Sequence, residues 1–226
     1  MIIYILIPAV TILIIFCFWR FYFFYRDPDR NIPSGRNIVS AADGTVVYVK
    51  QIKKGLLPIS IKRGREVRLD DVAPSIDSIM PHDKYIVGVF MHPTSVHFNR
   101  APVDGIIKFQ RYFGNKINLP MTLMWWRVVF GIKPYEAYSD HILKNERNII
   151  AIDGVVPVVV VQIADIYVNR IISNVKPGHK VIKGQKIGGI FLGSQVDIIF
   201  PCSSNLKILV HEGDKVTAGS SIIAEY

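Results

Sequence analysis

Cysteine is scarce in this chain, and charge is absent from its first nineteen residues. The 226 residues include two cysteines, Cys17 and Cys202, which stand in unrelated contexts without metal-ligand spacing. Their number and placement argue against a disulfide framework and a cysteine zinc site, and they favour a reducing compartment. We expect no bound metal.

The uncharged run, "MIIYILIPAVTILIIFCFW" (1–19), predicts a transmembrane helix. At about 1.5 Å per residue, it just spans a hydrocarbon core of about 30 Å. No basic residue precedes the run and no small-x-small motif follows it, so a retained anchor is favoured over a cleaved signal peptide. The rings and arginines of "RFYFFYR" (20–26) indicate an interfacial belt with positive charge inside. We expect residues 1–25 to anchor the protein in the cell membrane, with the remainder on the cytoplasmic side.

Basic residues outnumber acidic ones by 27 to 18, and many lie in "KQIKKGLLPISIKRGREVR" (50–68). Beside a membrane anchor such a cluster is drawn to anionic headgroups, each basic residue contributing about 1 kcal/mol. Nucleic acid is the competing partner, but we find no nucleic-acid-binding motif and expect none to bind. A merely solvated basic face is an equally good interpretation.

Beyond the anchor, "RDPDRNIPSGRN" (26–37) indicates an extended connector, which we place at 26–39, before a domain at 40–226. The domain should be mainly β with few helices, because short apolar or alternating runs are separated by turn residues. Helices are expected only around 68–79 and 163–174. The expected strands are 44–50, 85–91, 105–113, 148–154, 155–164, 187–192, 196–200, 206–210 and 221–226.

An internal repeat sharpens this interpretation. "VKPGHKVIKGQKIGGI" and "VHEGDKVTAGSSIIAEY" match at a constant offset of 35, with Gly178 matching Gly213 and Gly184 matching Gly219. Their V-x-x-G-x-K-V-x-x-G spacing resembles the turns of biotinyl- and lipoyl-type barrel-sandwich domains, with glycine where a tight turn needs positive φ. "SAADGTVVYV" (40–49) and "RAPVDGIIKF" (100–109) form a second related pair. We therefore predict a barrel-sandwich-hybrid-like β domain built from repeated pieces.

Two places carry residues suited to chemistry. In "GGIFLGSQVDIIF" (188–200), Gly193 and Ser194 interrupt an apolar strand, where glycine marks a bend and the serine hydroxyl needs a partner. In "FMHPTSVHFNRAPVDG" (90–105), His92, His97, Asn99 and Arg100 follow the end of an apolar run, where a strand could present them to a cavity. The five-residue spacing of the histidines does not favour a metal pair.

Taken together, these segments resemble the phosphatidylserine decarboxylases, in particular the short, archaeal-like members thought to act on archaetidylserine. The resemblance rests on the order of "YRDPDRNIP", "SAADGTVV", "HPTSVHFNRAPVDG", "NERN" and "GSQVDIIFP". It implies an enzyme, a carboxy-lyase that converts a serine phospholipid into the ethanolamine phospholipid and CO2. It also implies self-cleavage between Gly193 and Ser194.

The resemblance assigns roles to individual residues. Ser194 would attack the carbonyl of Gly193, and the resulting ester would cleave by β-elimination to leave a pyruvoyl group at residue 194. Asp43 and His97 would be the orienting acid and the base, with His97 acting alone or helped by His92. Longer members carry a second histidine where this chain has Arg100, so the identity of the self-cleavage base stays open. We expect His92, Asn99 and Arg100 to contact the substrate, with the Arg100 fork binding a phosphate or carboxylate. Gln195 is less usual at its position than threonine or arginine.

The pyruvoyl ketone would condense with the seryl amine of the anionic phospholipid and accept electrons as CO2 leaves, with no metal or external cofactor. The two cleaved chains should stay together. The sequence leaves open the lipid tails, acyl ester or isoprenoid ether, and the oligomeric state, a homo-oligomer included. The alternatives are a non-enzymatic, membrane-anchored biotinyl- or lipoyl-like module and an inactive relative. The first is disfavoured because Asp214-Lys215 is the only near match to a carrier lysine motif and lacks the alanine that follows it there.

Overall fold

The computed structural model describes residues 2–53, 56–61, 65–68, 76, 80, 82–166, 171–191 and 193–226. The helices are α1 (Ile2–Phe18), the π-helix η1 (Trp19–Phe23), α3 (Thr122–Val129) and α4 (His141–Lys144). The strands are β1 (Asn37–Val39), β2 (Gly44–Ile52), β3 (Leu56–Ile61), β4 (Arg65–Arg68), β5 (Lys84–Met91), β6 (Phe98–Arg100), β7 (Gly105–Phe113), β8 (Arg147–Asp153), β9 (Val158–Ala164), β10 (Ile171–Ser173), β11 (Lys180–Val181), β12 (Lys186–Ile190), β13 (Ser194–Pro201), β14 (Lys207–Ile208), β15 (Lys215–Val216) and β16 (Ile222–Glu225).

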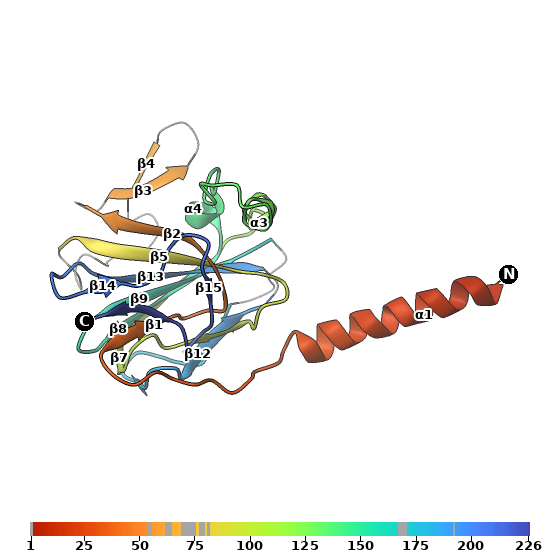
Figure 1. The fold of residues 1–226 in the computed structure, drawn as a ribbon, viewed down its shortest axis with the longest axis horizontal. Coiled ribbons are helices and arrows are strands. Elements are labelled where there is room, and N and C mark those ends of the chain that lie inside the picture. The colour runs from red at the N-terminus through yellow and green to blue at the C-terminus, as the bar shows by residue number, and fades with distance from the viewer. Residues whose placement is uncertain are drawn as a thin grey trace.

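The N-terminal helix stands apart from the rest of the molecule. In Figure 1, α1 extends away from the β domain. The stretch Leu6–Phe23 is long and apolar enough to cross a membrane, and none of it is buried in the protein. Phe24, the next residue, is buried in the domain. The arrangement matches the predicted anchor, with the chain joining the domain where η1 ends.

A curled, eight-stranded sheet forms the centre of the domain, in the order β11-β7-β8-β9-β13-β5-β2-β15 (Figure 1). One face buries a core against two small sheets, β1-β16-β14 and β10-β12-β6. The other face buries a second core, to which α3 and α4 contribute Met124 and Ile142. Strand β13 lies between β9 and β5, antiparallel to both. The predicted mainly-β fold with few helices is confirmed. Strand β13 begins at Ser194, in the middle of the sheet, with a neighbouring strand on each side.

The internal repeat has a structural counterpart at the two ends of this sheet. Lys180 and Val181 pair with Ile106 and Gly105. Their repeat mates, Lys215 and Val216, pair with Thr45 and Gly44 in the same antiparallel sense. The glycines that were expected to turn at positive φ, Gly178, Gly184, Gly213 and Gly219, all do so. Both related sequence pairs therefore come from one repeated strand arrangement.

One of the two predicted helices is wrong. Around 163–174, the chain instead continues β9 to Ala164 and forms β10 at Ile171–Ser173. Most of the expected helix at 68–79 lies outside the described residues. Among the described residues of the domain, the helices are α3 and α4, which fall where none was expected.

Candidate active site

The Gly193-Ser194 peptide joins a left-handed turn to the central strand. Gly193 has φ of +72°, and a Cβ added there would lie 2.6 Å from Oδ2 of Asp165. Both the backbone conformation and the close approach of this carboxylate therefore require glycine. Ser194 is 0 % exposed and sits opposite Met91 of β5 and Ala164 of β9. Its hydroxyl donates to the sulfur of Met91 at 3.1 Å, and none of the described residues donates a hydrogen bond to its oxygen.

Asp165 contacts the carbonyl group of this peptide. Its backbone N–H donates to the carbonyl oxygen of Gly193 at 3.2 Å. Its Oδ1 accepts hydrogen bonds from the backbone N–H of Met121 at 2.9 Å and of Ile166 at 2.6 Å. Burial raises the pKa of the Asp165 carboxyl, although these two hydrogen bonds oppose the shift. Sequence reasoning missed this residue; its position directly after the apolar run 155–164 was the available signal.

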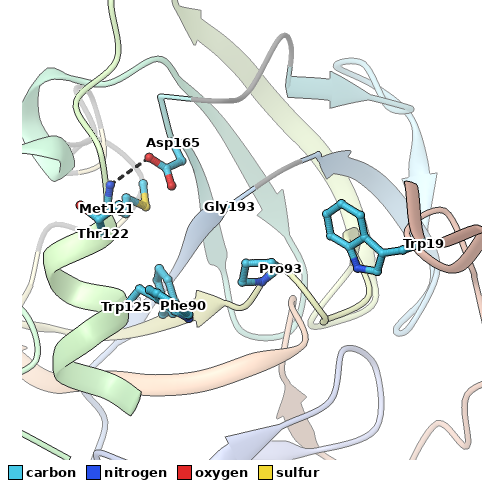
Figure 2. A pocket seen from close by; sticks show the side chains of 8 residues that line it. All are labelled: Trp19, Phe90, Pro93, Met121, Thr122, Trp125, Asp165 and Gly193. Carbon is cyan, nitrogen blue, oxygen red and sulfur yellow. Dashed lines mark hydrogen bonds between the residues drawn. The ribbon is translucent and has the colours of Figure 1, made fainter. Parts of the chain in front are cut away.

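A cavity of about 320 Å³ opens beside the same peptide (Figure 2). Among the described residues that line it, Asp165 carries the one ionisable side chain, and most of the remaining wall is aromatic or aliphatic. We call it the Gly193 cavity; its lining is Trp19, Phe90, Pro93, Met121, Thr122, Trp125, Asp165 and Gly193. Trp19 belongs to η1, so the end of the predicted anchor forms part of the wall. The cavity is therefore lined both by η1, through Trp19, and by α3, through Trp125, and Gly193 forms part of its wall.

His97 is a buried, neutral imidazole close to the strand that leads into the turn. It is 0 % exposed, and its ring stacks on Phe24 with 4.1 Å between ring centroids. Its backbone carbonyl accepts a hydrogen bond from the N–H of Ile190, three residues before Gly193. Neither ring nitrogen makes a hydrogen bond of normal geometry within the described part of the chain. Burial lowers the pKa of His97 to about 4, although a backbone hydrogen bond at Ser95 opposes the shift, so the imidazole is uncharged at neutral pH.

Asp43 and His92 lie at a different cavity, of about 670 Å³, where Arg26 and Lys215 are also found. The carboxylate of Asp43 accepts from Arg30 at 3.0 Å and from the backbone N–H of Ala218 at 2.7 Å. His92 shares a 2.9 Å hydrogen bond with the Thr45 hydroxyl. Among the described residues, no hydrogen bond links Asp43 to His97 or His97 to Ser194. The expected relay of Asp43, His97 and Ser194 is thus not connected by hydrogen bonds in this uncut chain.

Asn99 and Arg100 are adjacent in sequence but differ in what they contact. The Asn99 amide donates to the Met91 sulfur at 3.6 Å, the same atom that accepts from Ser194. Its carbonyl oxygen accepts from Gln162 at 2.7 Å. Arg100 instead donates to Asp27 of the connector at 2.6 Å and to the carbonyl of Gly184 at 2.8 Å. Asn99 is therefore linked to the serine through Met91, whereas Arg100 ties the connector to the domain.

A polar network that the sequence did not reveal lies on the opposite face of β13. Because side chains alternate along a strand, Gln195 and Asp197 point away from the Ser194 face. The hydroxyl of Tyr48 and the amide of Gln195 both donate to Oδ1 of Asp197 at 2.7 Å. The Gln195 carbonyl lies 3.3 Å from Nε2 of His141. Burial raises the pKa of Asp197 from 3.8 to about 7, and its Oδ2 has no hydrogen-bond partner in the described structure.

Asp197 should make the fold less stable as pH rises. The folded state binds a proton on the Asp197 carboxyl more tightly than the unfolded chain does, so the contribution of Asp197 to the free energy of unfolding is lost between about pH 4 and pH 7. Burial lowers the pKa of His97 and of His141 to about 4, which changes stability in the opposite direction over the same window, so the Asp197 effect is read as a difference between two proteins. We expect the thermal midpoint of the detergent-solubilised protein, measured relative to that of Asp197→Asn, to fall by several degrees from pH 4 to pH 7. Tyr48→Phe is the contrasting variant: it leaves the carboxyl in place and removes a hydrogen bond that lowers the Asp197 pKa, so the pH dependence should persist or grow. Equal pH dependence in Asp197→Asn and the unmodified protein would contradict the assignment.

Comparison with known proteins supplies the family. The family model described as phosphatidylserine decarboxylase matches residues 18–224. A protein of Methanocaldococcus jannaschii, whose name proposes an archaetidylserine decarboxylase proenzyme, is 38 % identical over 205 residues, covering 89 % of this chain and 87 % of its own. The phosphatidylserine decarboxylase proenzyme of Nitrosomonas europaea is 33 % identical over 207 residues, covering 90 % of this chain and 76 % of its own.

Proposed function

This chain belongs to the phosphatidylserine decarboxylase family, a family of carboxy-lyases, and we propose that it converts a serine phospholipid into the ethanolamine phospholipid and CO2 after cutting itself between Gly193 and Ser194. The observation that carries the proposal is the geometry of this one peptide bond. It combines a left-handed glycine, a fully buried serine and a backbone N–H on the glycine carbonyl, and it faces an apolar cavity. An ordinary strand would need none of these features.

The residues around the peptide suit an attack by Ser194 on the carbonyl carbon of Gly193. Glycine leaves that carbon unshielded, and the N–H of Asp165 is placed to stabilise negative charge as it develops on the carbonyl oxygen. The amide becomes an ester when the acyl group moves from the nitrogen to Oγ of Ser194. A base then removes the α-proton of residue 194, and the Gly193 carboxylate leaves. Addition of water to the remaining enamine and loss of ammonia give the pyruvoyl group.

His97 is the candidate base because its imidazole is buried and uncharged at neutral pH, and neither ring nitrogen is hydrogen-bonded to a side chain of the described residues. Asp43 and His92 keep their proposed supporting roles, from positions in the neighbouring cavity. Asn99 can act on the serine side through Met91. A substrate contact by Arg100 remains part of the proposal. To make this contact, the guanidinium would have to break its ion pair with Asp27 or bind Asp27 and the substrate together.

The pyruvoyl group supplies an electron-accepting ketone to which the lipid amine can be joined while CO2 leaves. The protein contributes position and surroundings. The anchor brings the domain to the membrane, and the positive charge that flanks the anchor favours the cytoplasmic side. Trp19, at the end of the anchor, lines the Gly193 cavity. The substrate can thus reach residue 194 without its tails leaving the bilayer.

Intact-mass measurement of the purified protein tests the proposal directly. We expect two chains, residues 1–193 and 194–226, the smaller one beginning with a pyruvoyl group and lacking a free amine. Because β13 pairs with β5 and β9 over most of its length, the two chains should elute together in native buffer. A single uncut species in active preparations, or a cut elsewhere, would refute the proposed cleavage.

A further inference from the structure

Asp165 leaves one carboxylate oxygen unused at the bond that is proposed to break. Oδ1 is occupied by the N–H groups of Met121 and Ile166, whereas Oδ2 accepts no hydrogen bond from a described residue. The position of a Cβ built on Gly193, 2.6 Å from Oδ2, shows that this oxygen faces the turn. In Figure 2, one oxygen of Asp165 is bonded to Met121 and the other points toward Gly193. The carboxylate is therefore held rigidly while half of it stays available.

The surroundings of Oδ2 favour a cationic ligand. A buried carboxylate is costly unless it is paired, and the Gly193 cavity contains no basic side chain among the described residues that line it. Its walls are Trp19, Phe90, Trp125 and other mainly apolar groups, which strengthen any charge interaction formed inside. A primary ammonium group that entered this cavity would find Asp165 as its one anionic partner on the described lining.

We propose that Asp165 is the residue that binds the ammonium group of the serine phospholipid and takes its proton. This inference rests on the function proposed above. The Asp165 carboxylate accepts one proton from R–NH3+, which gives R–NH2 and the neutral carboxylic acid. The nitrogen lone pair freed in this way is what the amine needs in order to add to the keto carbon at residue 194. The raised pKa of the Asp165 carboxyl makes it a better proton acceptor than an exposed aspartate.

Asp165→Asn separates this role from a structural one, because asparagine keeps an oxygen for Met121 and Ile166 but loses the charge. We expect the variant to self-cleave, with the KM for serine phospholipid raised about tenfold or more. Reductive trapping of the lipid amine on residue 194, read by mass, should slow at least as much. Methoxyamine, a neutral nucleophile at pH 7, should react with the same ketone at an unchanged rate. Asp153→Asn, which alters an exposed aspartate, is the matched control.

A second measurement uses the unmodified mature enzyme and needs no variant. The N,N-dimethylethanolamine phospholipid carries an ammonium group but cannot condense with a ketone, and the corresponding phosphatidylethanol carries none. We expect the first to compete with substrate at least tenfold better than the second. Equal competition by the two lipids, or equal slowing of methoxyamine and lipid trapping in Asp165→Asn, would overturn the proposal. Failure of the proposed function itself would look different, because the unmodified protein would then form no methoxyamine adduct.

Discussion

Ser194→Ala is expected to leave a single uncut chain of 226 residues with no decarboxylase activity. Alanine has no oxygen with which to attack the Gly193 carbonyl, and no leaving group can form at its β-carbon. The fold should survive, because the serine hydroxyl makes one weak hydrogen bond to Met91 and the rest of β13 keeps its two neighbours. Intact mass reports the cleavage, and release of labelled CO2 from a serine phospholipid reports the turnover.

The matched control for this experiment is Ser204→Ala, which alters an exposed serine beyond the end of β13. It should be cut and active like the unmodified protein. Ser194→Cys and Ser194→Thr keep a nucleophile and should be cut slowly. Full turnover by Ser194→Ala would end the pyruvoyl proposal, whatever the state of the chain.

Patterns within one segment were read correctly from the sequence. The run 105–113 forms β7 over its whole length, and the offset of 35 corresponds to two equivalent strand pairings at opposite ends of the sheet. Gly193 stood out because a glycine followed by serine disturbs an apolar strand, and the structure places it at positive φ. Strand alternation and turn glycines are local properties of the chain, so they can be recognised without its neighbours.

Contacts between distant segments were not available to the same reasoning. Helix α3 begins after Met121, which offers no capping side chain; the carboxylate that accepts its N–H is Asp165, 44 residues away. The same distance hid Asp165 from the list of site residues. The carboxylate of Asp43, which is proposed to orient His97, is bound by Arg30 of the connector and by the Ala218 backbone, partners that the sequence did not indicate. In each case a tertiary partner decides the outcome, and spacing along the chain gives no sign of it.

Phe24 covers His97 at the point where the N-terminal helices join the domain. Phe24 follows η1 directly, is buried, and stacks on the imidazole, so the segment that follows the candidate membrane span also covers the candidate base. This covering removes water from His97 and is a cause of its low pKa. Phe24→Leu keeps a large apolar side chain over His97 and should still exclude water from the imidazole. Phe24→Ala should admit water and raise the His97 pKa toward its ordinary value.

His97→Ala is expected to slow either self-cleavage or lipid turnover by about 10²-fold or more, the range for a lost general acid–base group. The imidazole is neutral at pH 7 because its pKa is lowered to about 4, so a role as base predicts a rate that falls only in acid, as the ring becomes protonated. Cleavage is followed by mass and turnover by CO2 release, so the two steps are separated.

Arg100→Ala is the contrasting variant: it should be cut normally and show a raised KM, provided that losing the Asp27 contact leaves the connector in place. An uncut Arg100→Ala chain would move the self-cleavage role to arginine. Normal cleavage and turnover in His97→Ala would leave His92 and Asp43, in the neighbouring cavity, as the groups to test next.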